Sequence, residues 1–85
     1  MMTLLWPDGE AVTVQDDELG SPRSFAWRGD FHRVQGIAKR WRVDYGWWYR
    51  RVWREYFKLY TDTGLLVVLY HDLLSREWYL QRFYD

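Results

Sequence analysis

Residues 54–84, REYFKLYTDTGLLVVLYHDLLSREWYLQRFY, decide the fold of this chain. They contain three runs rich in β-branched and aromatic residues, at 54–61, 65–70 and 77–84, a composition typical of strands. Asp62-Thr63-Gly64 separates the first two runs and favours a tight turn, because glycine adopts positive φ without steric cost. The uninterrupted apolar run at 65–70 is typical of a strand buried on both faces. The stretch therefore predicts three consecutive antiparallel strands.

Shorter strands are expected upstream of this stretch. Ala11–Gln15 alternates apolar and polar residues, and Thr3–Trp6 can pair with it as a hairpin across the turn at residues 7–9. Ser24–Arg28 is the next strand. Gly29-Asp30 then closes a tight turn that sends the chain back from Phe31.

Residues 31–43 have two interpretations. Val34, Ile37, Ala38, Trp41 and Tyr45 have the spacing of an amphipathic helix. The odd-numbered residues from 31 to 43 instead alternate as one face of a strand. Glycine at position 36 weakens a helix by about 1 kcal/mol relative to alanine, whereas in a strand it marks a bulge. We therefore predict a strand bent at this glycine, followed by a turn at residues 44–46.

The pattern as a whole predicts one small all-β domain over residues 1–85. We expect a strongly twisted antiparallel meander of about six strands, which can roll into a partly open barrel. Residues 1–9 form an N-terminal extension or hairpin arm, and residues 10–85 form the rest of the domain. The predicted core consists of Val12, Val14, Phe25, Trp27, Val34, Ile37, Trp41, Phe57, Leu59, Val67, Leu69, Trp78 and Leu80.

Composition restricts how the domain is stabilised and where we expect it. The chain has no cysteine, so packing of its seven Trp, seven Tyr and four Phe replaces disulfides. The lack of cysteine fits a reducing compartment, and we expect a cytoplasmic protein. Its first residues lack the basic start of a signal peptide, and no apolar run approaches the roughly 20 residues that span a bilayer.

Net charge is zero but unevenly distributed. Residues 1–22 carry −5, residues 23–58 carry +7 and residues 59–85 carry −2. In the basic segment, aromatic rings alternate with bases, as in proteins that hold single-stranded nucleic acid by phosphate contacts and base stacking. The predicted binding residues are Lys39, Arg40, Arg42, Trp47, Trp48, Tyr49, Arg50, Arg51 and Arg54.

The tryptophan pair gives the sharpest expectation. Neighbouring residues on a strand point to opposite faces, so Trp47 and Trp48 cannot both be buried in a one-sided sheet. One ring is then left for a ligand. The alternative is that such rings belong to the core and that arginine side chains cover them, with cation–π contact.

Other functions have different expectations. A protein-interaction module or a homodimer would use an exposed aromatic patch or a free sheet edge. An enzyme is not expected, because the only imidazoles, His32 and His71, lie in separate segments without a nucleophile motif. The acidic residues 16–18 are typical of a solvated loop, so neither a metal nor another cofactor is expected.

A series of landmarks resembles a known family. They are Phe25-Ala26-Trp27-Arg28-Gly29, Val34, Ile37, Trp41, Trp47-Trp48, Arg54-Glu55-Tyr56-Phe57, Leu69-Tyr70-His71-Asp72 and the closing Trp78–Asp85. In this order they resemble small uncharacterised bacterial proteins that form a domain-of-unknown-function family. They are also similar to the C-terminal segment of the polymerase-like mutasome subunit, an inactive relative of Y-family DNA polymerases. The resemblance covers residues 10–85 and implies a context of DNA repair or translesion synthesis, without catalytic residues.

Overall fold

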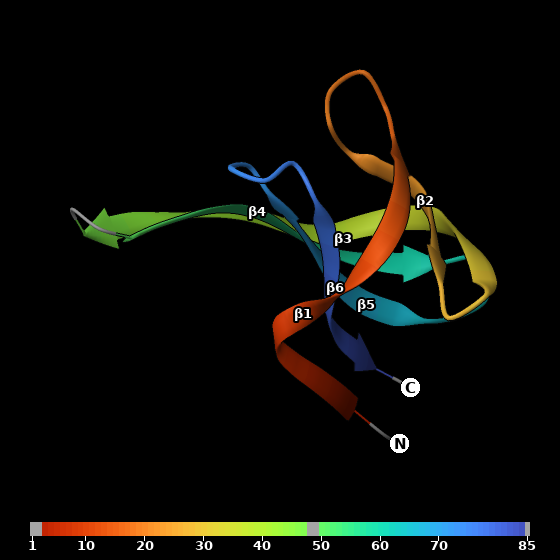
Figure 1. Ribbon diagram of the computed structural model, residues 1–85. Coiled ribbons are helices and arrows are strands. Elements are labelled where there is room, and N and C mark those ends of the chain that lie inside the picture. The colour runs from red at the N-terminus through yellow and green to blue at the C-terminus, as the bar shows by residue number, and fades with distance from the viewer. Residues whose placement is uncertain (1–2, 48–49, 85) are drawn as a thin grey trace.

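A computed structural model describes residues 3–47 and 50–84. These residues form six strands and no helix, which confirms the all-β prediction (Figure 1). No described segment is therefore a helix that could cross a membrane. The strands are β1 (Thr3–Asp16), β2 (Pro22–Trp27), β3 (Asp30–Trp47), β4 (Arg50–Thr61), β5 (Leu66–Asp72) and β6 (Trp78–Tyr84).

Each strand pairs antiparallel with the next, and β1 also pairs with β6. The ring of hydrogen-bonded strands is thus complete, where the sequence predicted a partly open arrangement. β1 closes the ring because it pairs with two strands. Residues 13–16 of β1 pair with β2, and residues 3–5 and 10–12 pair with β6. Thr3 lies opposite Tyr84, so the predicted hairpin of Thr3–Trp6 with Ala11–Gln15 is wrong. The start of β1 and the end of β6 lie side by side (Figure 1).

The β3–β4 hairpin extends beyond this ring. β2 pairs with β3 only from Asp30 to Arg33, and β5 pairs with β4 only from Arg54 onward. The hairpin itself continues to Trp47 opposite Arg50. Residues 44–47 of β3 and 50–52 of β4 therefore project as a two-stranded arm, which is seen at the left of Figure 1.

Two expectations for β3 have different outcomes. The chain is a strand through residues 30–47, and its register shifts between Val34 and Gly36, so the predicted bend at the glycine is confirmed. The predicted turn at residues 44–46 is wrong, because Asp44, Tyr45 and Gly46 pair with residues 51–53 of β4. Continuous cross-strand pairing overrides the local turn preference of Asp and Gly.

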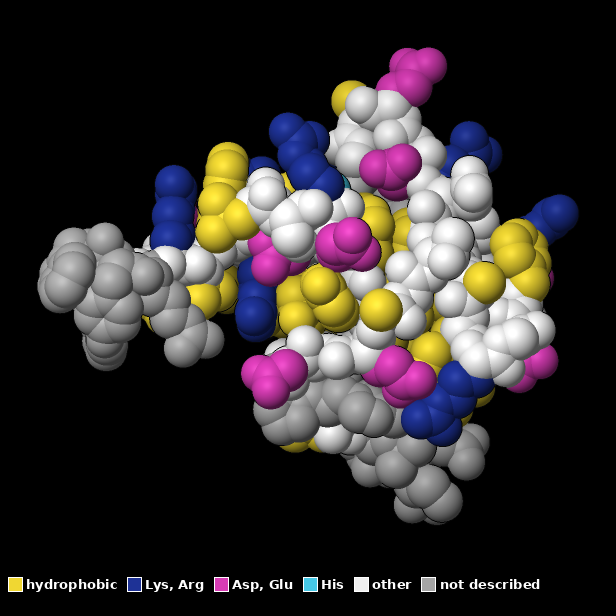
Figure 2. Space-filling model, viewed as in Figure 1, with side chains coloured by type: hydrophobic (Ala, Val, Ile, Leu, Met, Phe, Trp, Pro, Cys, Tyr) yellow, Lys and Arg dark blue, Asp and Glu magenta, His cyan; other side chains and the backbone are white. Residues whose placement is uncertain are grey.

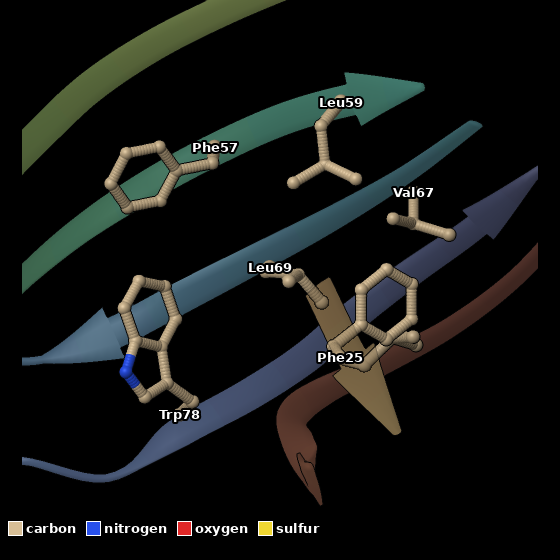
Figure 3. Packing of buried hydrophobic residues seen from close by; sticks show 7 residues of the cluster. Phe25, Phe57, Leu59, Val67, Leu69 and Trp78 are labelled. Atoms are coloured by element: carbon tan, nitrogen blue, oxygen red, sulfur yellow. The ribbon is translucent and has the colours of Figure 1, made fainter. Parts of the chain in front are cut away.

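The core fills the interior of the ring. Buried side chains from β2, β4, β5 and β6 point toward one another, among them Phe25, Phe57, Leu69 and Trp78 (Figure 3). Nearly all of the predicted core is found there or packed against it. Ile37 and Trp41 are the exceptions. Ile37 is 40% exposed, because β3 no longer pairs with β2 beyond Arg33. Trp41 packs instead against a second buried cluster, formed by Tyr56, Val68 and Tyr70.

Candidate functional site

The predicted binding residues lie along β3 and β4. Lys39, Arg40 and Arg42 are on β3, and Arg51 and Arg54 are on β4. The backbones of Trp47 and Arg50 pair at the end of the arm. Trp48 and Tyr49 lie outside the described residues, as do the side chains of Trp47 and Arg50. The expectation that one tryptophan ring is free therefore stays a prediction.

Two of these arginines bind a carboxylate on the core side of the hairpin. The Arg40 and Arg42 guanidinium groups each donate to Glu55, and both N–O distances are 2.8 Å. Glu55 is 8% exposed. Burial alone would raise the pKa of this carboxyl, but the hydrogen bonds from Arg42 and Arg40 outweigh it and leave the pKa below its ordinary value. Both guanidinium groups are therefore paired with a carboxylate of the same chain.

A third predicted arginine is paired within the arm. The Arg51 guanidinium donates to both Asp44 oxygens, at 3.3 and 3.2 Å, and lies over the Trp53 ring. Both members of the pair are about half exposed, so it contributes little stability. On the face shown in Figure 2, basic and acidic side chains are interspersed. The predicted residues therefore do not form one uninterrupted cationic patch.

An aromatic row crosses the opposite face of the sheet. We call this the outer face, because it points away from the core. Trp41, Tyr56, Tyr70 and Tyr79 lie opposite one another on β3, β4, β5 and β6. Successive ring centroids are 5.2, 5.2 and 5.0 Å apart. The rings therefore cover one another's faces, so the buried Tyr56 and Tyr70 cannot offer a free face to a nucleobase.

The aromatic row is closed at one end by β1. The Tyr70 hydroxyl donates to the Asp8 carbonyl at 2.6 Å, and burial raises the pKa of this phenol. Arg54, the fourth predicted arginine, lies 4.4 Å above the Tyr70 ring centroid and donates to the Tyr56 hydroxyl. Arg54 is therefore part of this packing and not a free cation.

A second row on the outer face is cationic. Lys39, Lys58 and Arg82 share one line across the sheet, with Val68 between the last two. We call Lys39, Lys58 and Arg82 the cationic row. The Lys39 ammonium lies over Trp41, and both Lys58 and Arg82 lie over Tyr84. No carboxylate in the described part of the chain forms an ion pair with any of the three.

Next to the cationic row lies an accessible ring. Tyr60 is 50% exposed and sits opposite Gly36 on β3. A shallow groove runs between Gly36 and Leu66, with the tyrosine in its wall. Tyr60 is therefore far more exposed than Tyr56 and Tyr70, the buried rings of the aromatic row.

Of these four residues, only Lys39 is among the predicted binding residues. Lys58 ends the basic and aromatic segment that the sequence indicated, but it was not selected as a site residue, and neither were Arg82 and Tyr60. Positions 58 and 60 alternate with the buried 57 and 59, which is a visible signal that they share the other face of β4. Arg82 could not be found in this way, because the register that aligns it with Lys58 includes a bulge in the β5–β6 pairing.

The two imidazoles have structural surroundings. His32 is buried and its Nδ1 lies 2.9 Å from the Thr63 hydroxyl. His71 stacks on Trp78, with ring centroids 4.3 Å apart. In residues 3–47 and 50–84, no group of three or more His, Asp or Glu side chains could hold a metal ion.

Comparison with protein-family models, with curated proteins and with solved structures finds no match to this chain. The resemblance to the domain-of-unknown-function family and to the mutasome subunit therefore stays a prediction from the sequence landmarks.

Proposed function

We propose that this protein is a non-catalytic module that binds single-stranded nucleic acid on the outer face of its sheet. Phosphate groups lie along the cationic row, and a base stacks on Tyr60. One observation carries the proposal: Lys39 and Lys58 lie directly opposite each other without a carboxylate partner in the described residues. Like charges in this position are destabilising, and a bound polyanion relieves their repulsion.

The arrangement favours single strands over duplexes. A phosphate backbone can follow the cationic row across neighbouring strands, about 4.8 Å apart. Stacking on Tyr60 requires an unpaired base, because a base inside a duplex has both faces covered. Zero net charge also fits duplex binding poorly, since domains that bind duplexes by charge are usually basic.

The wider context of the proposal comes from the sequence resemblance alone. A role beside DNA-repair or translesion-synthesis proteins would bring the module close to single-stranded DNA. A cytoplasmic location is part of the same proposal.

Fluorescence anisotropy with labelled oligothymidine tests this function at low salt. We expect Tyr60→Ala to weaken binding by about 1–3 kcal/mol, roughly 5- to 150-fold. Lys39→Glu should weaken it as well and reduce the salt dependence, since a phosphate contact is lost. Arg33→Glu is the matched control, because it makes the same charge change at an exposed position on the β2–β3 hairpin. Absence of binding at micromolar protein, or equal loss in the control, contradicts the proposal.

A further inference from the structure

β3 has a long edge that the described chain leaves unpaired. From Val34 to Trp47 this strand pairs with β4 on one side only, because β2 ends its pairing at Arg33. Near Arg40 the Ser21 hydroxyl accepts a hydrogen bond from the guanidinium, so the 16–22 loop lies close to that part. Beyond it, residues 41–43 lead into the projecting arm, and residues 44–47 belong to the arm itself (Figure 1). The N–H and C=O groups of alternate residues point away from β4 there and can pair with another strand.

We propose that two copies of this chain dimerise by antiparallel pairing of their β3 edges, on a two-fold axis at Val43. The dimer joins two arms into one four-stranded sheet. This inference does not depend on nucleic-acid binding, since it concerns the backbone edge of β3.

Symmetry restricts the register. A two-fold axis perpendicular to a continuous sheet keeps every side chain on its own face. Two residues that lie opposite each other share a face, so their numbers are both even or both odd. The axis therefore lies midway between one residue and the copy of the same residue in the partner. The candidate centres on the edge are the residues from Arg40 to Tyr45.

Charge selects among these centres. Centring on Arg40, Arg42 or Asp44 places that residue opposite the same charge, and centring on Trp41 places Arg40 opposite the partner's Arg42. Centring on Tyr45 leaves only the last residues of the strand to overlap.

Val43 is the remaining centre and is self-complementary. It places Arg42 opposite the partner's Asp44 twice, and Trp41 opposite the partner's Tyr45 twice. Opposite charges and aromatic rings in directly opposed positions stabilise antiparallel pairs.

Three of the side chains concerned are accessible, whereas Trp41 and Val43 are partly buried against the outer face. Arg42 is 57% exposed although it binds Glu55, and a guanidinium with five N–H donors can serve a second carboxylate. The Asp44 side chain is 50% exposed, and Tyr45 is 62% exposed. Charged residues usually protect an edge from pairing, but here they disfavour the registers centred on residues 40, 41, 42 and 44 and favour the one centred on Val43. Because the contact spans few residues, we expect a weak dimer that dissociates on dilution.

Cysteine cross-linking tests the register, since the natural chain has no thiol. Under mild oxidation, Val43→Cys should form an intermolecular disulfide, because its two copies lie about 4.5–5.5 Å apart. The matched control is Tyr45→Cys, whose copies lie four residues out of register, about 13 Å apart. Cross-linking of Val43→Cys no faster than the control overturns the proposal. Near-UV circular dichroism verifies that both variants are folded.

Sedimentation velocity of complementary charge variants provides a second test. Arg42→Asp makes positions 42 and 44 both acidic, and Asp44→Arg makes both basic, so each variant alone should be monomeric. An equimolar mixture should dimerise, because opposite charges then meet at both pairs. The sedimentation coefficient of the unaltered protein should rise from the monomer value toward the dimer value as its concentration increases from about 10 to 500 μM. An unaltered protein that is monomeric throughout this range, or a mixture that stays monomeric, contradicts the inference.

Discussion

Lys39 and Lys58 lie directly opposite each other on neighbouring strands of the outer face, and no described carboxylate pairs with either. Each ammonium instead rests on an aromatic ring, Trp41 for the first and Tyr84 for the second. Cation–π contact keeps these charges on the surface without neutralising them. A repulsive pair of this kind costs stability in the free protein and is relieved when an anion binds.

The lysine pair predicts that stability and binding change in opposite directions. Lys39→Glu replaces repulsion by attraction to Lys58, so we expect the free energy of unfolding to rise by about 0.2–1 kcal/mol. The same variant should bind oligothymidine more weakly. Urea denaturation monitored by tryptophan fluorescence measures the first effect. Arg33→Glu, which faces Ser24 and not a cation, should not be stabilised. A less stable Lys39→Glu protein would contradict this account.

Gly9 is expected to be sensitive to any side chain. Its φ is +81°, and an added Cβ would lie 2.6 Å from the Cβ of Tyr79 and 2.9 Å from the Tyr70 ring. Gly9→Ala should lower the unfolding free energy by more than 2 kcal/mol, because overpacking adds to backbone strain. Gly20→Ala separates the two effects, since φ there is +82° and an added Cβ meets nothing within 4 Å. Equal losses by thermal denaturation would show that close packing of β1 on the aromatic row is unimportant.

The Glu55 cluster predicts a pH dependence of stability. The pKa of Glu55 is lowered in the folded protein, so its contribution is present above its ordinary value of 4.5 and is lost as the pH falls through the folded pKa. Glu55→Gln should cost about 1–3 kcal/mol at neutral pH, because Arg40 and Arg42 lose their partner. It should also flatten the decline of stability below about pH 5. Glu18→Gln, in an exposed loop, is the control. An unchanged acid profile for Glu55→Gln would be inconsistent with this cluster.

Core packing predicts a large loss at Leu69. This side chain is fully buried in the same core cluster as Phe57, Trp78 and Leu80. Figure 3 shows it together with Phe57 and Trp78. Leu69→Ala should cost about 2–5 kcal/mol by urea denaturation, because it removes apolar contacts and leaves a cavity. Leu74→Ala makes the same change at an exposed position and should cost little. Similar losses in both variants would contradict the position of the core.

The sequence predicted the strands well because their signals are local. Alternation of side chains and the turn at residues 62–64 depend on neighbours in the chain, and both are found. The turn expected at 44–46 was wrong. The identity of these residues favours a turn locally, but it does not show that they pair with β4. The partner of Thr3–Trp6 was also out of reach, because β6 lies nearly 80 residues away in the chain.

The binding site was harder to predict for the same reason. Composition indicated a basic and aromatic segment, but it could not show which arginines bind carboxylates. Arg40 and Arg42 form ion pairs with Glu55, and Arg51 forms an ion pair with Asp44. In the cationic row, Lys58 and Arg82 form no ion pair with a described carboxylate, and they come from strands that only cross-strand register brings together.

Backbone amide NMR during titration with oligothymidine tests the central claim most directly. We predict that the largest shift changes fall on the outer face, around Lys39, Lys58, Tyr60 and Arg82, and that the turn at residues 28–30 is unaffected. Saturable changes at those positions, lost in the Lys39→Glu variant, are the expected result. No shift changes at millimolar oligonucleotide, or changes restricted to the 16–21 loop, would contradict nucleic-acid binding by this face.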